Sequence, residues 1–129
     1  PYPFSHVSGF YQTVLVVPDQ VTSAVLNDAM QLVLWFGSAS PIEYSAPRIA
    51  FAEEVDEAVR QNNHLVLLGG PGENSLLSEI NSYLPQPFVA DSNLLKPLVI
   101  DNVAFLTDPS RSAGLVEVIV SPWNETYSV

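Results

Sequence analysis

The amino-acid sequence predicts a three-layer α/β domain with a mainly parallel sheet and helices on both faces. An apolar run followed by a segment of helical periodicity occurs three times along the chain. The runs are short, continuous and rich in β-branched residues, which is typical of parallel strands buried on both faces. A chain of 129 residues can bury one sizeable core and is short for two domains. We therefore expect residues 1–129 to form one domain.

The first strand and helix are read from residues 13–40. "TVLVVP" (Thr13–Pro18) is a β-branched run closed by proline, which predicts a buried strand. In the segment after it, Thr22 or Ser23 can cap a helix and Gly37 can end it. The apolar residues expected to face the core recur at helical spacing: Val25, Ala29, Val33 and Phe36.

The second and third units follow the same order. "RIAF" (48–51) predicts a short strand, and "AEEVDEAVRQNN" (52–63) predicts a helix with acidic residues early and Arg60 late, as a helix dipole favours. "HLVLLGG" (64–70) predicts a third buried strand, and "ENSLLSEINSYL" (73–84) predicts a third helix. The apolar face of that helix is expected to consist of Leu76, Leu77, Ile80 and Leu84.

The remaining third of the chain predicts strands without helices. A proline-rich connection (85–97) leads to two short strands, "LVID" and "VAFLT", around Asp101-Asn102. "GLVEVIVSP" (114–122) predicts another strand, and "TYSV" (126–129) is interpreted as the start of one more strand that is cut short. Since the sequence also begins without Met, we expect it to be a fragment of a longer multidomain chain.

Charge and composition exclude several classes of function. The chain has fourteen acidic residues and only four basic ones, so it lacks the cationic patch that binds nucleic acid or an anionic membrane surface. Without cysteine there are no disulfides, no thiolate catalysis and no cysteine-ligated metal. No apolar run approaches the length of a membrane-spanning helix.

A glycine-containing loop joins the third strand to the third helix. Glycines at such a position let backbone amides approach an anion, which makes four residues candidates for ligand binding: Gly70, Gly72, Asn74 and Ser75. No lysine completes a P-loop, Ser75 stands where GxGxxG requires its third glycine, and Glu73 repels phosphate. The pattern therefore favours a turn in which Asn74 or Ser75 caps the helix, with phosphate binding as the alternative.

Other reactive or aromatic residues offer weaker patterns. His64, Ser75 and Asp101 could compose a hydrolase triad, but no G-x-S-x-G elbow accompanies them, and a lone histidine at a core strand is more often packed. The acidic cluster at 53–57 lacks the spacing of a calcium loop, so we predict no metal site. Trp123 and Tyr127, in "SPWNETY", could stack on sugar rings, although closure of the core by Trp123 is the simpler interpretation.

Four stretches together resemble a known family: "LVVPDQ", "RIAFAEEVDEAV", "NNHLVLLGGPGENSLL" and "GLVEVIVSPWNETYSV". They look like the flavodoxin-like domain of the regulatory subunit family of bacterial cellulose synthase. This resemblance implies flavodoxin-like strand order and a non-catalytic module. It also implies carbohydrate-binding domains in the same chain and a partner in the membrane-embedded glycosyltransferase, with the full chain extracytoplasmic and anchored to the membrane.

The sequence argues against FMN and cyclic di-GMP, the two ligands that a flavodoxin-like fold and this regulatory subunit family suggest. FMN needs a Ser/Thr-rich loop after the first strand, where this chain has Pro18 and Asp19. Cyclic di-GMP receptors of the PilZ type carry RxxxR, which is absent, and "DPSRSAG" (108–114) puts its glycine one place late. We predict no cofactor and no direct membrane contact.

The function we expect is a structural or interaction module of a cellulose (exopolysaccharide) synthesis and export apparatus, which positions neighbouring domains or guides the glucan. The alternative is a small-molecule or nucleotide-binding module that uses the loop from Gly69 to Ser75.

Overall fold

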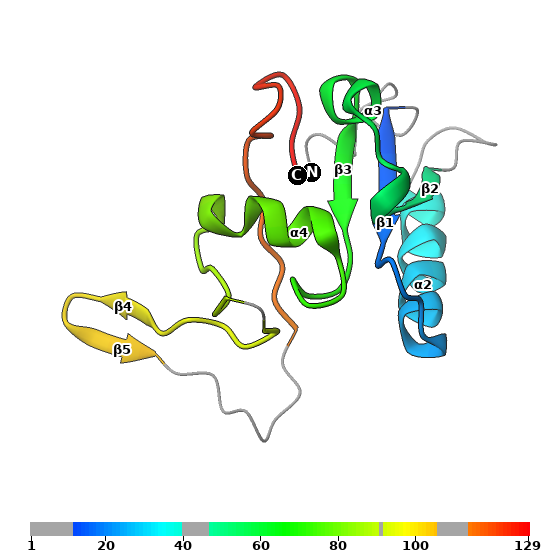
Figure 1. Ribbon diagram of the computed structural model, residues 1–129. Coiled ribbons are helices and arrows are strands. Elements are labelled where there is room, and N and C mark those ends of the chain that lie inside the picture. The colour runs from blue at the N-terminus through cyan, green and yellow to red at the C-terminus, as the bar shows by residue number, and fades with distance from the viewer. Residues whose placement is uncertain (1–11, 40–46, 91, 106–113) are drawn as a thin grey trace.

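The computed structural model describes residues 12–39, 47–90, 92–105 and 114–129 (Figure 1). Its centre is a three-stranded parallel sheet of order β2-β1-β3, formed by β1 (Thr13–Val17), β2 (Arg48–Phe51) and β3 (His64–Leu67). All five residues of β1 are buried, as expected for a continuous apolar run in the middle of a parallel sheet. The predicted parallel sheet and its three strands are confirmed.

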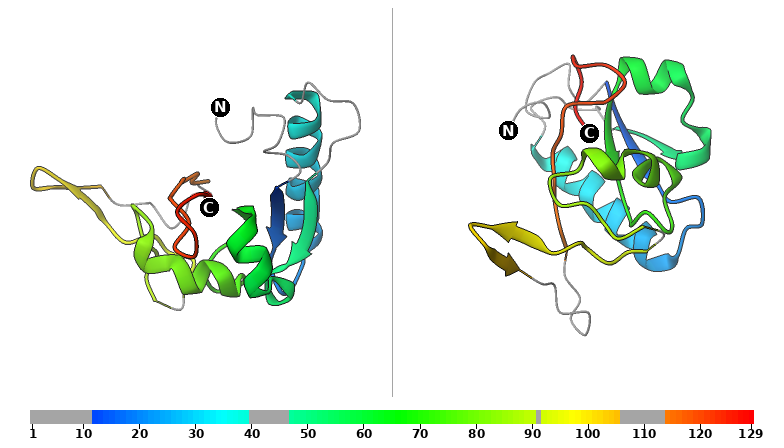
Figure 2. Two further views of the ribbon diagram at one scale, coloured as in Figure 1. Left: turned by 90° about the horizontal axis from the view of Figure 1, so that it is seen from above. Right: turned by 60° about the vertical axis from the view of Figure 1, so that its left-hand side comes forward.

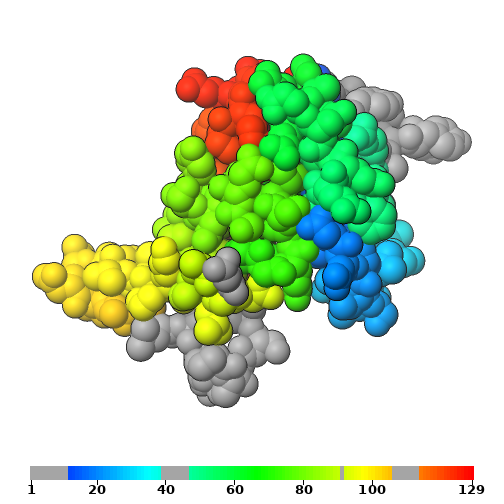
Figure 3. All heavy atoms as spheres, in the orientation of Figure 1, coloured from blue at the N-terminus to red at the C-terminus, as the bar shows by residue number. Residues whose placement is uncertain are grey.

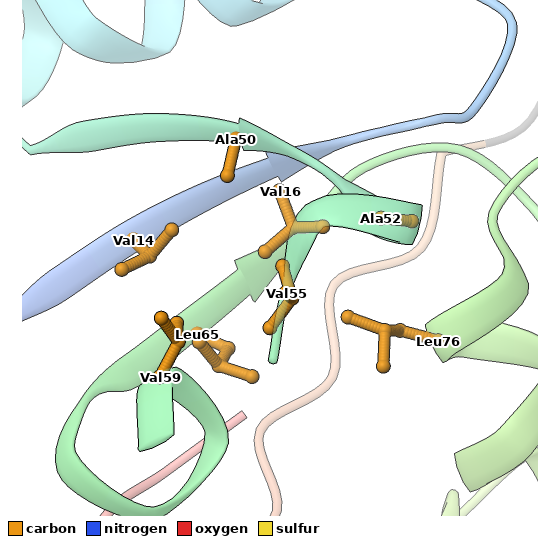
Figure 4. Packing of buried hydrophobic residues seen from close by; sticks show 8 residues of the cluster. All are labelled: Val14, Val16, Ala50, Ala52, Val55, Val59, Leu65 and Leu76. Atoms are coloured by element: carbon orange, nitrogen blue, oxygen red, sulfur yellow. The ribbon is translucent and has the colours of Figure 1, made fainter. Parts of the chain in front are cut away.

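Helices pack against both faces of this sheet (Figure 2). On one face, Ala29 of α2 (Ser23–Ala39) packs with Leu15 and Val17 of β1. On the other face, the short helices η1 (Ala52–Glu54), α3 (Glu57–Asn62) and α4 (Ser75–Ile80) surround a second apolar cluster. Figure 4 shows the side chains of this cluster pointing toward one another: Val14, Val16, Ala50, Ala52, Val55, Val59, Leu65 and Leu76.

The flavodoxin-like arrangement stays a prediction. The order β2-β1-β3 agrees with the first three strands of the flavodoxin-like order 2-1-3-4-5. Among the described residues, however, no fourth strand joins this sheet. The structure therefore supports a mixed α/β domain with a parallel sheet and flanking helices, which is a coarser statement than the one the sequence predicted.

Two helix ends differ from the predictions. Thr22 accepts the N–H of Val25 and starts α2 as expected, but the helix continues through Gly37 to Ala39. Gly37 does not end it because its backbone is not in the left-handed conformation that a glycine stop requires. The predicted helix at 52–63 is split, since Val55 is extended and Asp56 begins a new helix by accepting the N–H of Val59.

The third predicted helix is also divided, into α4 and the one-turn helix η2 (Asn81–Tyr83). Its expected apolar face is confirmed, because Leu76, Leu77 and Ile80 are buried and Leu84 is partly buried. Asn74 takes the capping position.

The two predicted strands around Asp101-Asn102 form an antiparallel hairpin, β4 (Leu98–Ile100) and β5 (Val103–Phe105). Both turn residues have positive φ, as a two-residue hairpin turn of type I′ demands. The hairpin projects from the body of the domain (Figure 3).

The prediction of a strand at 114–122 is wrong. In this segment Val120 forms a single bridge with Ser128, while Ile119 and Val129 exchange backbone hydrogen bonds of 2.8 and 3.0 Å. Its pairing is confined to residues 119–121, opposite 127–129, so no regular strand forms over 114–122. The predicted start of a strand at "TYSV" is likewise not a regular strand, since Ser128 forms only this isolated bridge. The Ser128 carbonyl also accepts the N–H of Leu65 (3.0 Å).

Candidate functional site

The glycine loop leaves the carboxyl end of β3 and enters α4. Gly69 has φ +96°, a left-handed conformation that glycine adopts without strain. The carbonyl of Gly70 accepts the N–H groups of Glu73 and Asn74, at 3.0 and 2.9 Å. These bonds close a tight turn at the place where nucleotide-binding α/β domains hold phosphate.

Asn74 is completely buried and uses both ends of its amide. Its side-chain oxygen accepts the N–H of Leu77 (3.2 Å), which caps α4, and its side-chain nitrogen donates to the carbonyl of Leu68 (2.9 Å). The cap therefore also fastens the end of β3 to the start of α4.

The carboxylate of Asp19 lies at the point where a bound anion would sit. Its two oxygens accept the backbone N–H of Glu53 (2.8 Å) and that of Ser75 (3.2 Å). Asp19 thus supplies one negative group to the first turns of both η1 and α4, where backbone amides lack partners within the helix. The N–H of Asp19 in turn donates to the carbonyl of Glu73 (3.1 Å).

Asn93, from the connection after α4, fills the other side of the loop. Its side-chain oxygen accepts the N–H of Gly72 (3.0 Å), and the same side chain occupies the space where a Cβ on Gly70 would lie. The absence of side chains at Gly70 and Gly72 therefore makes room for a residue of this protein. The N–H groups of Gly72 and Ser75, which could have bound phosphate, instead donate to the side chains of Asn93 and Asp19.

Trp123 lies between two helices at the opposite end of the sheet. Its indole N–H donates to Glu79 Oε1 (3.2 Å), and the guanidinium carbon of Arg60 lies 5.3 Å from the centre of its ring. Arg60 also forms an ion pair with Glu79 at 3.1 Å. The partly buried ring packs against the core cluster, so the expectation that Trp123 closes this end of the core agrees with its contacts.

Tyr127 packs edge-on against the ring of His64, with 5.1 Å between the ring centres. His64 is buried, and its Nδ1 accepts the N–H of Ser128 (3.0 Å). Burial lowers the pKa of His64 because the charged imidazolium loses hydration. His64 is thus a packed residue of the core.

The six predicted site residues do not meet in one site. Gly70, Gly72, Asn74 and Ser75 lie between the carboxyl end of β3 and the start of α4 (Figure 1). Tyr127 lies against His64 at the amino end of β3, and Trp123 lies against Arg60 and Glu79. The sequence predicts Asp19 only as an obstacle to flavin binding and does not predict its role as an internal anion. Its place directly after a buried strand was the available signal, whereas nothing in the sequence pointed to Asn93.

Other predicted chemistry finds no assembly in the described residues. Ser75, His64 and Asp101 lie at three separate places: the start of α4, the start of β3 and the turn of the β4–β5 hairpin. In the described ranges, no three His, Cys, Asp or Glu residues gather as metal ligands. "DPSRSAG" lies outside the described residues except for Gly114. No helix in the described ranges is long and apolar enough to span a membrane.

The family model described as "Cellulose synthase BcsB, second FD domain" matches residues 1–129. Searches of curated proteins and of solved structures found no match.

Proposed function

Because this chain belongs to the BcsB family, as its second FD domain, we propose that it is a non-catalytic structural and interaction module of a cellulose synthase regulatory subunit. In this role it positions neighbouring domains of the subunit or guides the glucan during synthesis and export. Its partners are the membrane-embedded catalytic subunit and adjacent carbohydrate-binding domains. The domain lies outside the cytoplasm, in a chain anchored to the membrane.

One observation supports a structural role over a ligand-binding one. Amides of the glycine loop donate to side chains of the protein itself, namely Gly72 to Asn93 and Ser75 to Asp19. A phosphate-bearing ligand would have to displace the Asp19 carboxylate and overcome repulsion from Glu73 next to it. These bonds favour a role for the loop in joining β3 to α4. Contacts with partners are then made by the rest of the domain surface.

The ligand arm of the test is a thermal-shift screen with FMN, nucleotides, cyclic di-GMP and cello-oligosaccharides. A ligand present at 100 times its Kd would add about 2.7 kcal/mol of stability. We expect no shift with the phosphate-bearing compounds. A shift that Asp19→Asn increases would show that an anion competes with Asp19 for the loop, and would overturn the proposal in favour of a nucleotide-binding module.

The partner arm uses the full-length regulatory subunit. Variants that destabilise this domain are expected to reduce both recovery of the catalytic subunit in a pull-down and cellulose output in cells. Leu65→Asp is a suitable variant because Leu65 is 1% exposed and lies in the core cluster, and Val116→Asp is its matched control because Val116 is 92% exposed. Normal recovery and cellulose output with Leu65→Asp would contradict the proposed role.

A further inference from the structure

One face of the edge strand β2 is left uncovered by α2. Ile49 pairs in register with Leu15, and Phe51 with Val17, so each pair points to the same face of the sheet. The two β1 side chains are 0% and 4% exposed, whereas Ile49 and Phe51 are 55% and 41% exposed. α2 therefore covers β1 and leaves the neighbouring strand open to solvent.

The flank of α2 that borders this open strand is also apolar. Leu26, Met30 and Leu34 are spaced four residues apart, which places them in one stripe along the helix, and all three are exposed. Together with Ile49 and Phe51 they line a cavity of about 380 Å³, here named the α2–β2 groove. Two secondary-structure elements thus present a continuous apolar surface.

The dimensions of an α/β layer determine what fits this groove. Neighbouring strands lie about 4.8 Å apart and packed helices lie about 8–10 Å apart, so one helix covers about two strands. α2 packs over β1 and β3, through Leu15, Val17 and Val66. The next helix position in this layer is above β2, alongside α2.

The charges around the groove define the occupant further. Among the described residues that line it, Glu54 is the charged one, and Glu53 and Asp19 lie at the same end, joined by a hydrogen bond. Arg48 pairs in register with Val14, so its side chain points to the opposite face of the sheet. A second copy of the chain would bring another net charge of −10 to this acidic end. A helix with basic residues is complementary to it.

We propose that the α2–β2 groove binds an amphipathic α-helix of a partner protein, whose apolar stripe is flanked by lysine or arginine. The helix lies parallel to α2, since this direction puts its positive N-terminal end near Glu54. The inference deepens the proposed function, on which it rests, by stating the chemistry of the partner.

The test measures binding of a fluorescent helical peptide about as long as α2, which has 17 residues. The peptide carries a leucine stripe with lysine on both sides. We expect Met30→Glu and Leu34→Glu to weaken its binding at least tenfold, because each places a carboxylate in the apolar groove. Both side chains are more than 60% exposed, so the variants are expected to fold, as circular dichroism can verify.

The controls distinguish specific binding in the groove from nonspecific hydrophobic binding and from a general effect of charge. Val116→Glu adds the same charge at an exposed valine outside the groove, and it is expected to leave binding unchanged. Peptides with a scrambled stripe, or with glutamate in place of lysine, are expected to bind at least tenfold more weakly. Equal binding by Met30→Glu or by the scrambled peptide would overturn the proposal. So would dimerisation of the wild-type chain that Met30→Glu abolishes, because a second copy would then be the occupant.

The outcome is distinguishable from failure of the proposed function. If the peptide does not bind while disruption of the domain still lowers recovery of the catalytic subunit, the groove proposal fails and the proposed function stands. If the peptide binds but disruption of the domain changes neither recovery nor cellulose output, the proposed function fails instead.

Discussion

The carboxylate of Asp19 accepts the backbone N–H of Ser75 at 3.2 Å, across 56 positions of sequence. The same carboxylate accepts the N–H of Glu53. One side chain that follows β1 thereby holds the first turns of η1 and α4, which themselves follow β2 and β3. The carboxyl ends of all three strands are joined through Asp19.

Replacing Asp19 by alanine is expected to lower the free energy of unfolding by about 1–2 kcal/mol. Two backbone amides lose a charged acceptor, and water replaces it in part because these bonds are exposed. Urea denaturation measures the change. Asp28→Ala removes a carboxylate from an exposed position of α2 and is expected to change stability by less than about 0.5 kcal/mol. An equal loss in the two variants would mean that net charge, and not the bridge, sets the effect.

Asn74→Ala is expected to cost about 1–3 kcal/mol of stability. It removes the cap of α4 and leaves the Leu68 carbonyl without its donor. Ser75→Ala is the control, since its exposed side chain belongs to the first residue of the helix, and we expect a change below about 0.5 kcal/mol. If Ser75→Ala proved as costly as Asn74→Ala, Asn74 would not be the residue that matters for this helix start.

Asn74 and Asp19 show what the sequence could predict and what it could not. The sequence predicts a cap at Asn74 or Ser75 because capping is local: polar residue, helix start and apolar spacing all lie within a few positions. The structure assigns the cap to Asn74. The three parallel strands were predicted for the same reason, from continuous β-branched runs. The bridge from Asp19 to Ser75 depends on the order of strands in space, which a local pattern does not contain.

The errors also have a physical explanation. Gly37 is expected to end α2, but a glycine ends a helix through a left-handed backbone conformation, which Gly37 does not adopt. "GLVEVIVSP" has the composition of a strand, yet a strand needs a partner along its whole length, and this segment pairs with three residues. At the candidate site, the residue types indicated a helix cap and a turn. The sequence did not predict which side chains contact one another in the folded domain.

The contact of Gly70 with Asn93 can be tested by a double-mutant cycle. Gly70→Ala alone is expected to destabilise the domain by about 1–3 kcal/mol, because the new methyl group overlaps the Asn93 side chain and displaces it from the Gly72 N–H. Adding Asn93→Ala is expected to cost less than the sum of the single changes, since the overlap is removed. Strict additivity in urea denaturation would contradict this packing.

Trp123 is expected to contribute more to stability than the other tryptophan, Trp35. Trp123→Ala removes packing on the core together with the contacts to Arg60 and Glu79, for a loss of about 2–4 kcal/mol. Trp35→Ala changes a side chain that is 55% exposed on α2, and a loss below about 1 kcal/mol is expected. Similar losses would show that Trp123 does not close the core.

The stability of the domain is expected to fall as the pH drops below about 6.5, in a step that depends on His64. Burial lowers the pKa of His64 in the folded state. Above about 6.5 the ring is neutral in both states, so it adds no pH dependence. Below that value the unfolded chain binds a proton that the folded chain resists, and folding becomes less favourable until the pH reaches the folded pKa. Protonation of Nδ1 would also break its bond with the Ser128 N–H.

Urea midpoints between pH 7.5 and pH 5 measure the slope of stability against pH. His64→Gln is expected to reduce the slope relative to the wild type, and an unchanged slope would assign it to the carboxylates.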